Sequence, residues 1–308
     1  MILNCGEALI DMVAGKTSDD QAAFVPHSGG AVMNTAVALG RLGVPPGFFA
    51  GLSSDFFGAQ LKAHLEASHV SYDLCPISDA ATTLAFVQLV NGQAKYTFFD
   101  ENTALRGLST NDIPTLPDDI DALFFGGISL AYGSCAEAYE AMLLSATDTH
   151  VTMIDPNIRP SFVRDEASFR ARIERMVSAS DIVKLSDEDL EWIAGAGDIA
   201  TNARALLAKG PKLVLITQGS EGATAYHADY DVFVPTIPVD LSNSDTIGAG
   251  DTFNAGVLAS LHEAGLMNKE AIANLSKQDA ENAVSYGMKA ASITVSRKGA
   301  NPPWKHEL

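Results

Sequence analysis

A short glycine-containing segment near residue 250 is the part of the chain best suited to chemistry. Residues 245–253 read Asp-Thr-Ile-Gly-Ala-Gly-Asp-Thr-Phe and lead into a helical pattern. The backbone N–H groups of the small residues Gly248, Ala249 and Gly250 can converge on one point, where a helix N-terminus adds positive potential for a phosphate. Asp251 then lies beside the transferring group and can accept the proton of an incoming hydroxyl. A merely capped helix would show the same residues, so a second motif has to decide.

A second glycine turn opens a helix about two hundred residues earlier. Residues 28–43 read Ser-Gly-Gly-Ala-Val-Met-Asn-Thr-Ala-Val-Ala-Leu-Gly-Arg-Leu-Gly, with apolar residues at helical spacing and a final glycine typical of a helix C-terminus. Gly29 and Gly30 allow a ligand to approach the backbone closely, and Asn34 in the first turn offers a donor and an acceptor to a polyhydroxylated molecule. The alternative is a tightly packed helix of small residues.

Together, these two motifs resemble the paired signatures of the ribokinase-like (PfkB) sugar kinases. The resemblance spans essentially the whole chain, residues 1–308, which is expected to form a single ribokinase-like domain. It implies direct in-line transfer of the ATP γ-phosphate to a primary hydroxyl of a small sugar, with Asp251 as base and the amides of Gly248 to Gly250 as anion hole. The chain contains neither a Walker loop nor a Gly-x-Gly-x-x-Gly segment after a strand, so the P-loop and Rossmann alternatives lack their motifs.

Three further side chains are candidate sugar ligands. Asp11, placed at the end of a predicted short N-terminal strand, can accept bonds from two neighbouring hydroxyls, and the matching aspartate in relatives contacts the sugar. A turn aspartate is the alternative. Residues 155–160 read Asp-Pro-Asn-Ile-Arg-Pro and resemble an element of the fructokinase and 2-keto-3-deoxygluconate kinase branch. That resemblance places Asn157 and Arg159 at the junction of sugar and phosphates, while a surface ion pair is the alternative for Arg159.

The other predicted ATP-binding residues are one lysine, argued from its position, and four residues implied by the family resemblance. Lys184, expected to end a buried strand, can reach the ATP phosphates, and a lysine that extends to the surface is the alternative. The resemblance also implies residues near the phosphates, ribose and adenine, namely Thr217, Gly219, Gly222 and Asn282.

The cofactors that the resemblance implies are ATP and Mg²⁺. No side chain is assigned as a metal ligand, because Mg²⁺ keeps several waters and takes few protein ligands. Residues 186–189 read Ser-Asp-Glu-Asp where the family often has Asn-x-x-Glu, so at most Asp189 organises waters around the metal. Asp245, with carbonyls from Ile247 and the turn 296–301, is a candidate site for K⁺, as in several relatives.

Short apolar runs alternate with amphipathic stretches along most of the chain. The runs that read as buried parallel strands are 122–126, 151–155, 182–185 and 213–217. Their continuous hydrophobicity implies helices on both sheet faces, for which 137–144 and 169–177 are suited. The expected fold is therefore α/β: a three-layer, doubly wound, mainly parallel sheet. Ligands bind beyond the carboxyl ends of such strands, where Asp155, Lys184 and Thr217 fall.

Two segments depart from this alternation. One is the stretch 11–27, and the other is a β-rich pair, 82–90 and 95–99, joined by Asn91-Gly92, which suits a two-residue hairpin turn. The family resemblance implies a small β-sheet lid over the sugar, formed discontinuously by about 12–28 and 71–105, through which a homodimer is expected. Lid closure excludes water from the phosphoryl donor. A surface decoration is the alternative.

Composition limits the partners and the compartment. With 38 acidic and 20 basic side chains the formal charge is −18, which repels nucleic acid and anionic membranes. Cys5, Cys75 and Cys135 are odd in number and widely spaced, as expected in a reducing cytoplasm. The start of the chain has no signal-peptide pattern, and no segment approaches transmembrane length. We expect a cytoplasmic enzyme.

Within the family, three features look most like bacterial fructokinases: Gly6-Glu7, residues 155–160 and residues 96–104. D-Fructose is therefore the expected substrate. The nearest alternative is 2-keto-3-deoxygluconate kinase, whose substrate carboxylate should require an extra cation; Lys95 and Arg106 flank the lid, but no basic cluster lies within it. Ribokinase or nucleoside kinase activity is a further alternative, ranked below the keto acid kinase. A non-catalytic sugar sensor is the alternative of a different class, against which the intact Gly-Ala-Gly-Asp argues.

Overall fold

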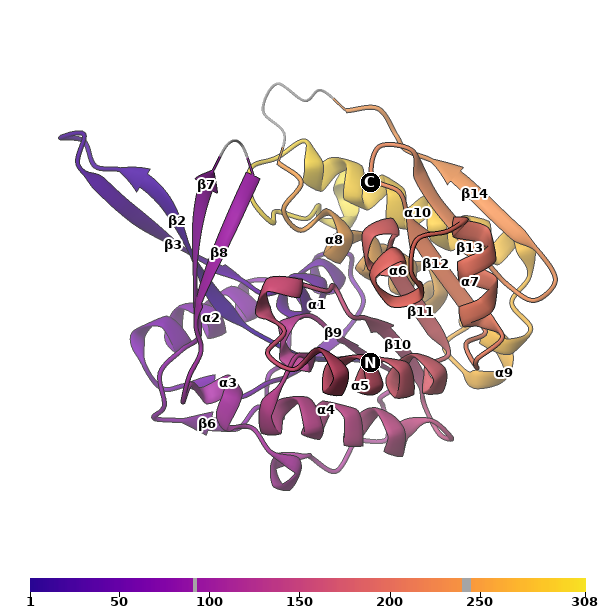
Figure 1. Ribbon diagram of the computed structural model, residues 1–308, viewed down its shortest axis with the longest axis horizontal. Coiled ribbons are helices and arrows are strands. Elements are labelled where there is room, and N and C mark those ends of the chain that lie inside the picture. Colours follow the sequence, from indigo (N-terminus) through magenta and orange to yellow (C-terminus); the bar gives the residue numbers. More distant parts are fainter. Residues whose placement is uncertain (91–92, 240–244) are drawn as a thin grey trace.

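One large, mainly parallel sheet forms the centre of the computed structural model, which describes residues 1–90, 93–239 and 245–308 (Figure 1). Its strand order is β14-β13-β12-β11-β10-β9-β1-β4. The strands from β4 to β12 pair in parallel, whereas β13 and β14 add to the edge antiparallel. Their bounds are β1 Ile2–Cys5, β4 Pro46–Phe49, β9 Ala122–Gly126, β10 Val151–Asp155, β11 Ile182–Ser186, β12 Leu213–Thr217, β13 Gly222–Tyr226 and β14 Asp231–Pro235.

Helices cover both faces of this sheet. One face carries α1 (Ala31–Arg41), α2 (Phe56–Ala67), α8 (Ala249–Glu263), α9 (Lys269–Ala273) and α10 (Lys277–Val295). The other carries α4 (Gly133–Ala146), α5 (Glu166–Ala179), α6 (Asp187–Ala194) and α7 (Ile199–Leu207). Shorter helices are α3 (Ala104–Gly107) and the 3₁₀ turns η1 (Thr110–Asp112), η2 (Ile128–Leu130), η3 (Pro160–Phe162) and η5 (Lys305–Glu307). The expected three-layer α/β fold is confirmed.

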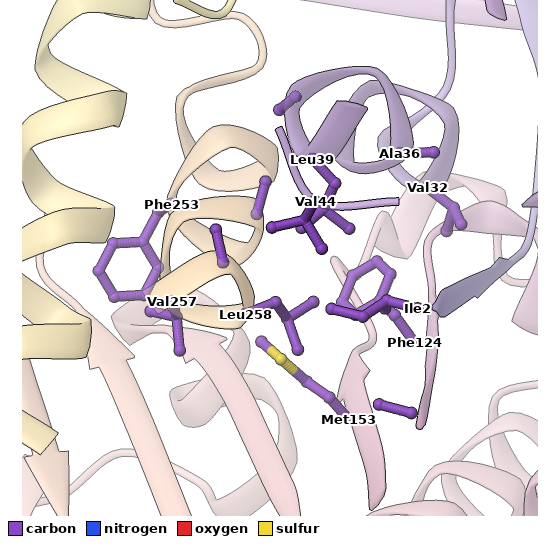
Figure 2. Packing of buried hydrophobic residues seen from close by; sticks show 14 of the residues in the cluster. Ile2, Val32, Ala36, Leu39, Val44, Phe124, Met153, Phe253, Val257 and Leu258 are labelled. Carbon is purple, nitrogen blue, oxygen red and sulfur yellow. The ribbon is translucent and has the colours of Figure 1, made fainter. Parts of the chain in front are cut away.

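The continuous apolar strands serve two cores at once. In β9, Ala122 and Phe124 join the core under α1 and α8, while Leu123 and Phe125 join the core under α4 and α5. Figure 2 shows Leu258 of α8 facing the strand residues of the first core. Because successive side chains of a strand point to opposite faces, a strand buried on both faces has to be apolar throughout.

Helix α8 is fixed by close backbone packing. A Cβ added to Gly256 of α8 would lie 2.6 Å from Cα of Gly287 in α10, so only glycine permits this approach. Helix α1 packs against α8 as well. The helix that carries Asp251 is therefore held by two neighbouring helices.

A small sheet of order β3-β2-β7-β8 projects from the body (Figure 1). Its strands are β2 (Leu9–Lys16), β3 (Ala22–Gly29), β7 (Leu84–Val90) and β8 (Gln93–Phe99); β5 (Leu52–Ser53) and β6 (Ile77–Ser78) form a separate pair. Strands β7 and β8 pair antiparallel, as the hairpin pattern predicts, while the predicted turn at Asn91-Gly92 lies outside the described residues.

The position predicted for Asp11 was wrong. The first strand ends at Cys5, and Asp11 is the third residue of β2 in the small sheet. The chain leaves the large sheet at Gly6, where a Cβ would lie 2.3 Å from Cγ2 of Val32. Apolar residues stand on both sides of this break, so the sequence reads as one strand.

Candidate active site

A cavity of about 320 Å³ lies where the small sheet meets the carboxyl ends of the central strands and the start of α8. Most of the predicted ligands line it: Asp11, Gly30, Asn34, Asn157, Arg159, Lys184, Gly248, Gly250 and Asp251. It is also lined by Ile247, a candidate K⁺ ligand, and by residues for which the sequence predicts no ligand role: Glu7, Leu9, Ala31, Phe98, Gly127, Ile128 and Thr246. The cavity therefore joins segments that are far apart in the sequence.

Asp251 is the third residue of α8 and is buried. The helix begins after Gly248, which has φ +76° and whose Cβ would lie 2.7 Å from Cβ of Ala300. Oδ2 of Asp251 accepts a hydrogen bond of 2.9 Å from Nδ2 of Asn34 in α1. Burial raises the pKa of Asp251 to about 7; the Asn34 bond opposes this rise, and the charge of Asp155 adds to it. A carboxylate poised near neutral pH suits a general base.

The start of α8 presents backbone N–H groups to the cavity. Within the described residues, those of Gly250 and Asp251 have no hydrogen-bond acceptor, as expected in a first helical turn. The N–H of Ala249 instead donates to the carbonyl of Thr246 at 3.2 Å, and Ala249 does not line the cavity. The predicted contribution of Ala249 to the anion hole is thus corrected, because the turn itself uses that amide.

Lys184 adds a cation to the same region. It is the third residue of β11 rather than the last, so its predicted place in the strand is corrected: Leu185 and Ser186 continue the pairing with β12. Its Nζ donates to Oδ2 of Asp155 at 2.9 Å and lies 3.3 Å from the position that a Cβ on Gly250 would take. Because the side chain is buried, the alternative of a surface-directed lysine does not hold.

The protonation of Lys184 follows from its neighbours. Burial lowers the pKa of the ammonium group, but the carboxylates of Asp155, Asp189 and Asp251 outweigh burial and leave the pKa raised. Lys184 therefore stays charged near neutral pH and, with the N-terminus of α8, makes one end of the cavity suited to a phosphate.

Asp189 has a structural task. One of its oxygens accepts the N–H of Ile158 at 2.9 Å, and the other accepts the N–H of Ser186 at 3.3 Å. With Ser186 it forms the capping box that starts α6. Asp189 does not line the cavity. Its two hydrogen bonds join the turn after β10 to the start of α6, and a role in organising waters around the metal stays a prediction.

The opposite end of the cavity carries Asp11. A Cβ on Gly29 would lie 2.3 Å from Oδ2 of Asp11, so Gly29 makes room for this carboxyl group without lining the cavity itself. Burial raises the pKa of Asp11 to about 7, and the charge of Glu7 adds to this effect. A carboxyl group here can exchange hydrogen bonds with sugar hydroxyls.

The turn after β10 brings Asn157 and Arg159 to the cavity. Asn157 has φ +45°, which asparagine tolerates better than most residues, and its N–H donates to Oδ1 of Asp155 at 3.2 Å. Arg159 donates to the carbonyl of Ile158 at 3.0 Å and forms no ion pair with a described carboxylate. Arg159 therefore has no ion-pair partner among the residues that the structure describes, and the ion-pair alternative is not supported there.

The remaining nucleotide candidates do not line the cavity. They are Thr217, Gly219, Gly222 and Asn282. Gly222 has a local reason to be glycine, since a Cβ would lie 2.2 Å from the carbonyl oxygen of Val234 in the paired strand β14. Asn282 is exposed on α10 and accepts a hydrogen bond from Gln278. Their roles stay predictions.

The two segments predicted to hold a monovalent cation do meet. Oδ2 of Asp245 accepts the N–H of Gly299 at 3.1 Å, and Oδ1 accepts the N–H of Ile247 at 3.0 Å. Among the described residues, no group of three or more His, Cys, Asp or Glu side chains is placed to hold a metal ion.

Comparison with known proteins finds relatives that match nearly the whole length of the chain. The family model described as "pfkB family carbohydrate kinase" matches residues 1–307. A fructokinase of Rhizobium leguminosarum bv. trifolii is 50% identical over 282 residues, covering 92% of this chain and 86% of that protein. Fructokinase-1 of Oryza sativa subsp. japonica is 30% identical over 317 residues, covering 100% and 95%. The crystal structure of a fructokinase from Xylella fastidiosa with bound ATP has a TM-score of 0.86 at 28% identity, covering 97% and 93%.

Proposed function

Since this chain belongs to the pfkB family of carbohydrate kinases, we propose that its cavity transfers the γ-phosphate of ATP to a primary hydroxyl of D-fructose. The observation that carries this proposal is the buried Asp251, held by Asn34 beside the free N–H groups of α8 and the ammonium group of Lys184. A base and an anion site then lie side by side, as phosphoryl transfer requires.

In this mechanism Asp251 accepts the proton of the attacking hydroxyl. The N–H groups of Gly250 and Asp251 and the cation of Lys184 stabilise the charge on the phosphoryl oxygens. Asp11 and Asn157 orient the sugar through its hydroxyls. Mg²⁺, held by the nucleotide and by water, would neutralise part of the phosphate charge at this end of the cavity. No protein nucleophile is needed, so no covalent phosphoenzyme forms.

One of the two cations that flank the small sheet is not free to bind the carboxylate of a keto acid. Arg106, the flanking cation whose side chain the structure describes, is buried and donates from Nε to Oδ2 of Asp100 at 2.6 Å. Its remaining donors bind the carbonyls of Tyr132 and Ile128. Arg106 is therefore already paired and is not available to a substrate carboxylate, whereas Arg159, which lines the cavity, is assigned to the junction of sugar and phosphates. The side chain of Lys95 lies outside the described part of the chain.

The assembly and the compartment belong to the proposal as well. We infer that two copies pair through the small sheet, because Phe24 and Phe99 are 40% and 59% exposed on it. A cytoplasmic location suits the three cysteines, which are free and buried. The net charge of −18 supports a small-molecule substrate rather than nucleic acid or an anionic membrane as partner. No helix in the described parts of the chain is long and apolar enough to cross a membrane.

The experiment that tests the activity is ADP release by the purified protein with ATP and Mg²⁺. Fructose, 2-keto-3-deoxygluconate, ribose, adenosine and no acceptor are compared at equal concentration. We expect strong turnover with fructose. A preference for the keto acid would contradict the substrate while keeping the mechanism, and absence of turnover with every acceptor would favour a sugar sensor.

A further inference from the structure

One buried carboxylate, Glu7, joins two helix starts that have no side-chain cap of their own. Helix α1 begins after Gly30 and turn η2 begins after Gly127, and neither glycine can supply a capping oxygen. Oε1 of Glu7 accepts the N–H of Ala31 at 3.0 Å. Oε2 accepts the N–H of Ser129 at 3.2 Å. Glu7 thus satisfies a first-turn N–H group in each element, although it belongs to neither.

The two glycines are explained by how closely Glu7 packs. A Cβ on Gly127 would lie 2.0 Å from Oε1, and one on Gly30 would lie 2.7 Å from the carbonyl oxygen of Glu7. The carbonyl of Glu7 also accepts the N–H of Met33 at 3.3 Å. The loop after β1, the start of α1 and the start of η2 therefore form one packed unit around this side chain, which is only 1% exposed.

This unit carries the walls of the cavity. Glu7, Gly30, Gly127 and Ile128 line it, and Asn34, one turn further along α1, holds Asp251. The charge of Glu7 also acts on both carboxyl groups of the cavity. Burial is the main cause of the raised pKa of both Asp11 and Asp251, and the charge of Glu7 adds to each; for Asp251 this addition is smaller than the effects of Asn34, Asp155 and Lys184.

We propose that Glu7 is a positioning residue of the sugar site: its two oxygens fix α1 and η2 around the sugar, and its place in the cavity wall lets its charge act on the carboxyl groups there. The inference rests on the proposed kinase function, since it assigns Asp251 as the base. The length of the Glu7 side chain and its charge are different properties, and one substitution is chosen to change each.

Glu7→Gln keeps the length but removes the charge and one of the two acceptor oxygens. Glu7→Asp keeps the charge but is too short to bridge both N–H groups. We expect Glu7→Gln to move the acidic limb of the kcat/KM profile for fructose to lower pH by about half a unit or more. We expect Glu7→Asp to leave the limb in place while KM for fructose rises on the order of tenfold, at unchanged KM for ATP.

The matched control is Asp181→Asn. Asp181 is also buried and accepts a backbone N–H, that of Thr152 at 2.8 Å, but it pairs with Lys269 and does not line the cavity. It should lose stability without moving the limb or KM for fructose. If Glu7→Gln keeps the wild-type limb, if Glu7→Asp keeps the wild-type KM, or if Asp181→Asn moves either as far, the proposal is wrong.

A measurement without substrate separates this inference from the choice of sugar. The ligand-free protein is unfolded with urea between pH 4 and pH 8. Four carboxyl groups of the described residues have a raised pKa, those of Glu7, Asp11, Asp189 and Asp251, and each contributes a loss of stability to the wild type as the pH rises through this range. Glu7→Gln should reduce that loss even if fructose is not the substrate, because its own carboxyl group no longer ionises and its charge no longer acts on Asp11 and Asp251. A loss equal to that of the wild type would overturn the charge effect.

Discussion

Asp251 illustrates how a single carboxyl group acquires a role from its surroundings. It is buried, it accepts one hydrogen bond from a neutral amide, and its nearest cation, Lys184, is already paired with Asp155. In water, hydration stabilises the charged carboxylate. In the buried site, few hydrogen bonds or cations make up for the hydration that is lost, so the protonated form is favoured. The result is a carboxyl group that binds its proton until the pH is near 7. Such a group can both accept and hold a proton at the working pH.

Asp251→Asn should abolish most of the turnover and leave the fold intact. The amide has the same shape and retains an oxygen for the hydrogen bond from Asn34, but it cannot accept the hydroxyl proton. We expect kcat to fall on the order of 10² to 10⁴, with nucleotide affinity within a few-fold of the wild type. Single-turnover kinetics and nucleotide titration measure the two quantities. Wild-type kcat in this variant would refute the assignment of the base.

The same substitution should change stability in a pH-dependent way. A carboxyl group whose pKa is about 7 when folded and 3.8 otherwise binds more protons in the folded state between these values. The folded protein is therefore penalised as the pH rises from 4 to 7, by about 4 kcal/mol once the group is fully ionised. Asp251→Asn removes that penalty, so it should be more stable than the wild type at pH 8 and similar to it at pH 4.

Chemical denaturation at the two pH values tests this sign. Asp198→Asn is the control, because Asp198 is exposed and its pKa is lowered by hydrogen bonds from Thr201. That variant should lose stability above pH 4 rather than gain it. If Asp251→Asn is no more stable than the wild type at pH 8, burial does not penalise the charged form of Asp251.

At the scale of elements, a buried ion pair, that of Asp100 and Arg106, joins the small sheet to the body. Asp100 directly follows β8, and it binds Arg106 and the hydroxyl of Tyr132. The guanidinium groups of Arg106 and Arg164 lie on the Tyr132 ring, each 4.1 Å from its centre. Phe98, two residues before Asp100, lines the cavity. This cluster therefore holds the end of β8, and with it one wall of the cavity, against the body.

Arg106→Ala should destabilise the protein by about 3 to 5 kcal/mol, because it leaves the carboxylate of Asp100 buried without its partner. Arg164→Ala is the matched control. It removes a guanidinium group from the same ring, but its side chain is 55% exposed, so the loss should stay below about 1 kcal/mol. Guanidinium chloride denaturation of both variants measures the difference. Equal losses would show that Asp100 does not depend on Arg106.

The sequence predicts these elements unequally, for a physical reason. The strands at 122–126 and 151–155 were predictable because burial on both faces requires an unbroken apolar run. Asn34 and Asp251 were assigned because their two glycine turns occur together in the pattern of one family, whereas each turn alone would also fit a capped or tightly packed helix. The roles of Glu7 and Asp100 were not, since each depends on partners from distant segments, and a sequence shows only the carboxyl group and not what surrounds it.

At the scale of the whole molecule, the small sheet exposes an apolar face. Phe98 lines the cavity, so its neighbour Phe99 points to the opposite face of β8. Phe24 of β3 and Phe99 both contact Phe86 edge-on, with ring centres 4.9 Å and 5.3 Å apart. Aromatic rings from three strands thus form one outward surface. Such a surface favours association with a second copy, which is also a way to cover the sheet edges.

Phe24→Glu should convert the proposed dimer into a monomer. The substitution places a charge among the aromatic rings, where pairing would have to remove it from water. Phe233→Glu is the control, because Phe233 is 54% exposed on β14, at the far edge of the large sheet. Sedimentation should give twice the chain mass for the wild type and for Phe233→Glu, and a single chain mass for Phe24→Glu. A wild type that sediments as a monomer would contradict the dimer. If the monomer also has a raised KM for fructose, pairing stiffens the sheet that closes over the sugar; an unchanged KM would mean that the ion pair of Asp100 and Arg106 is enough to hold it.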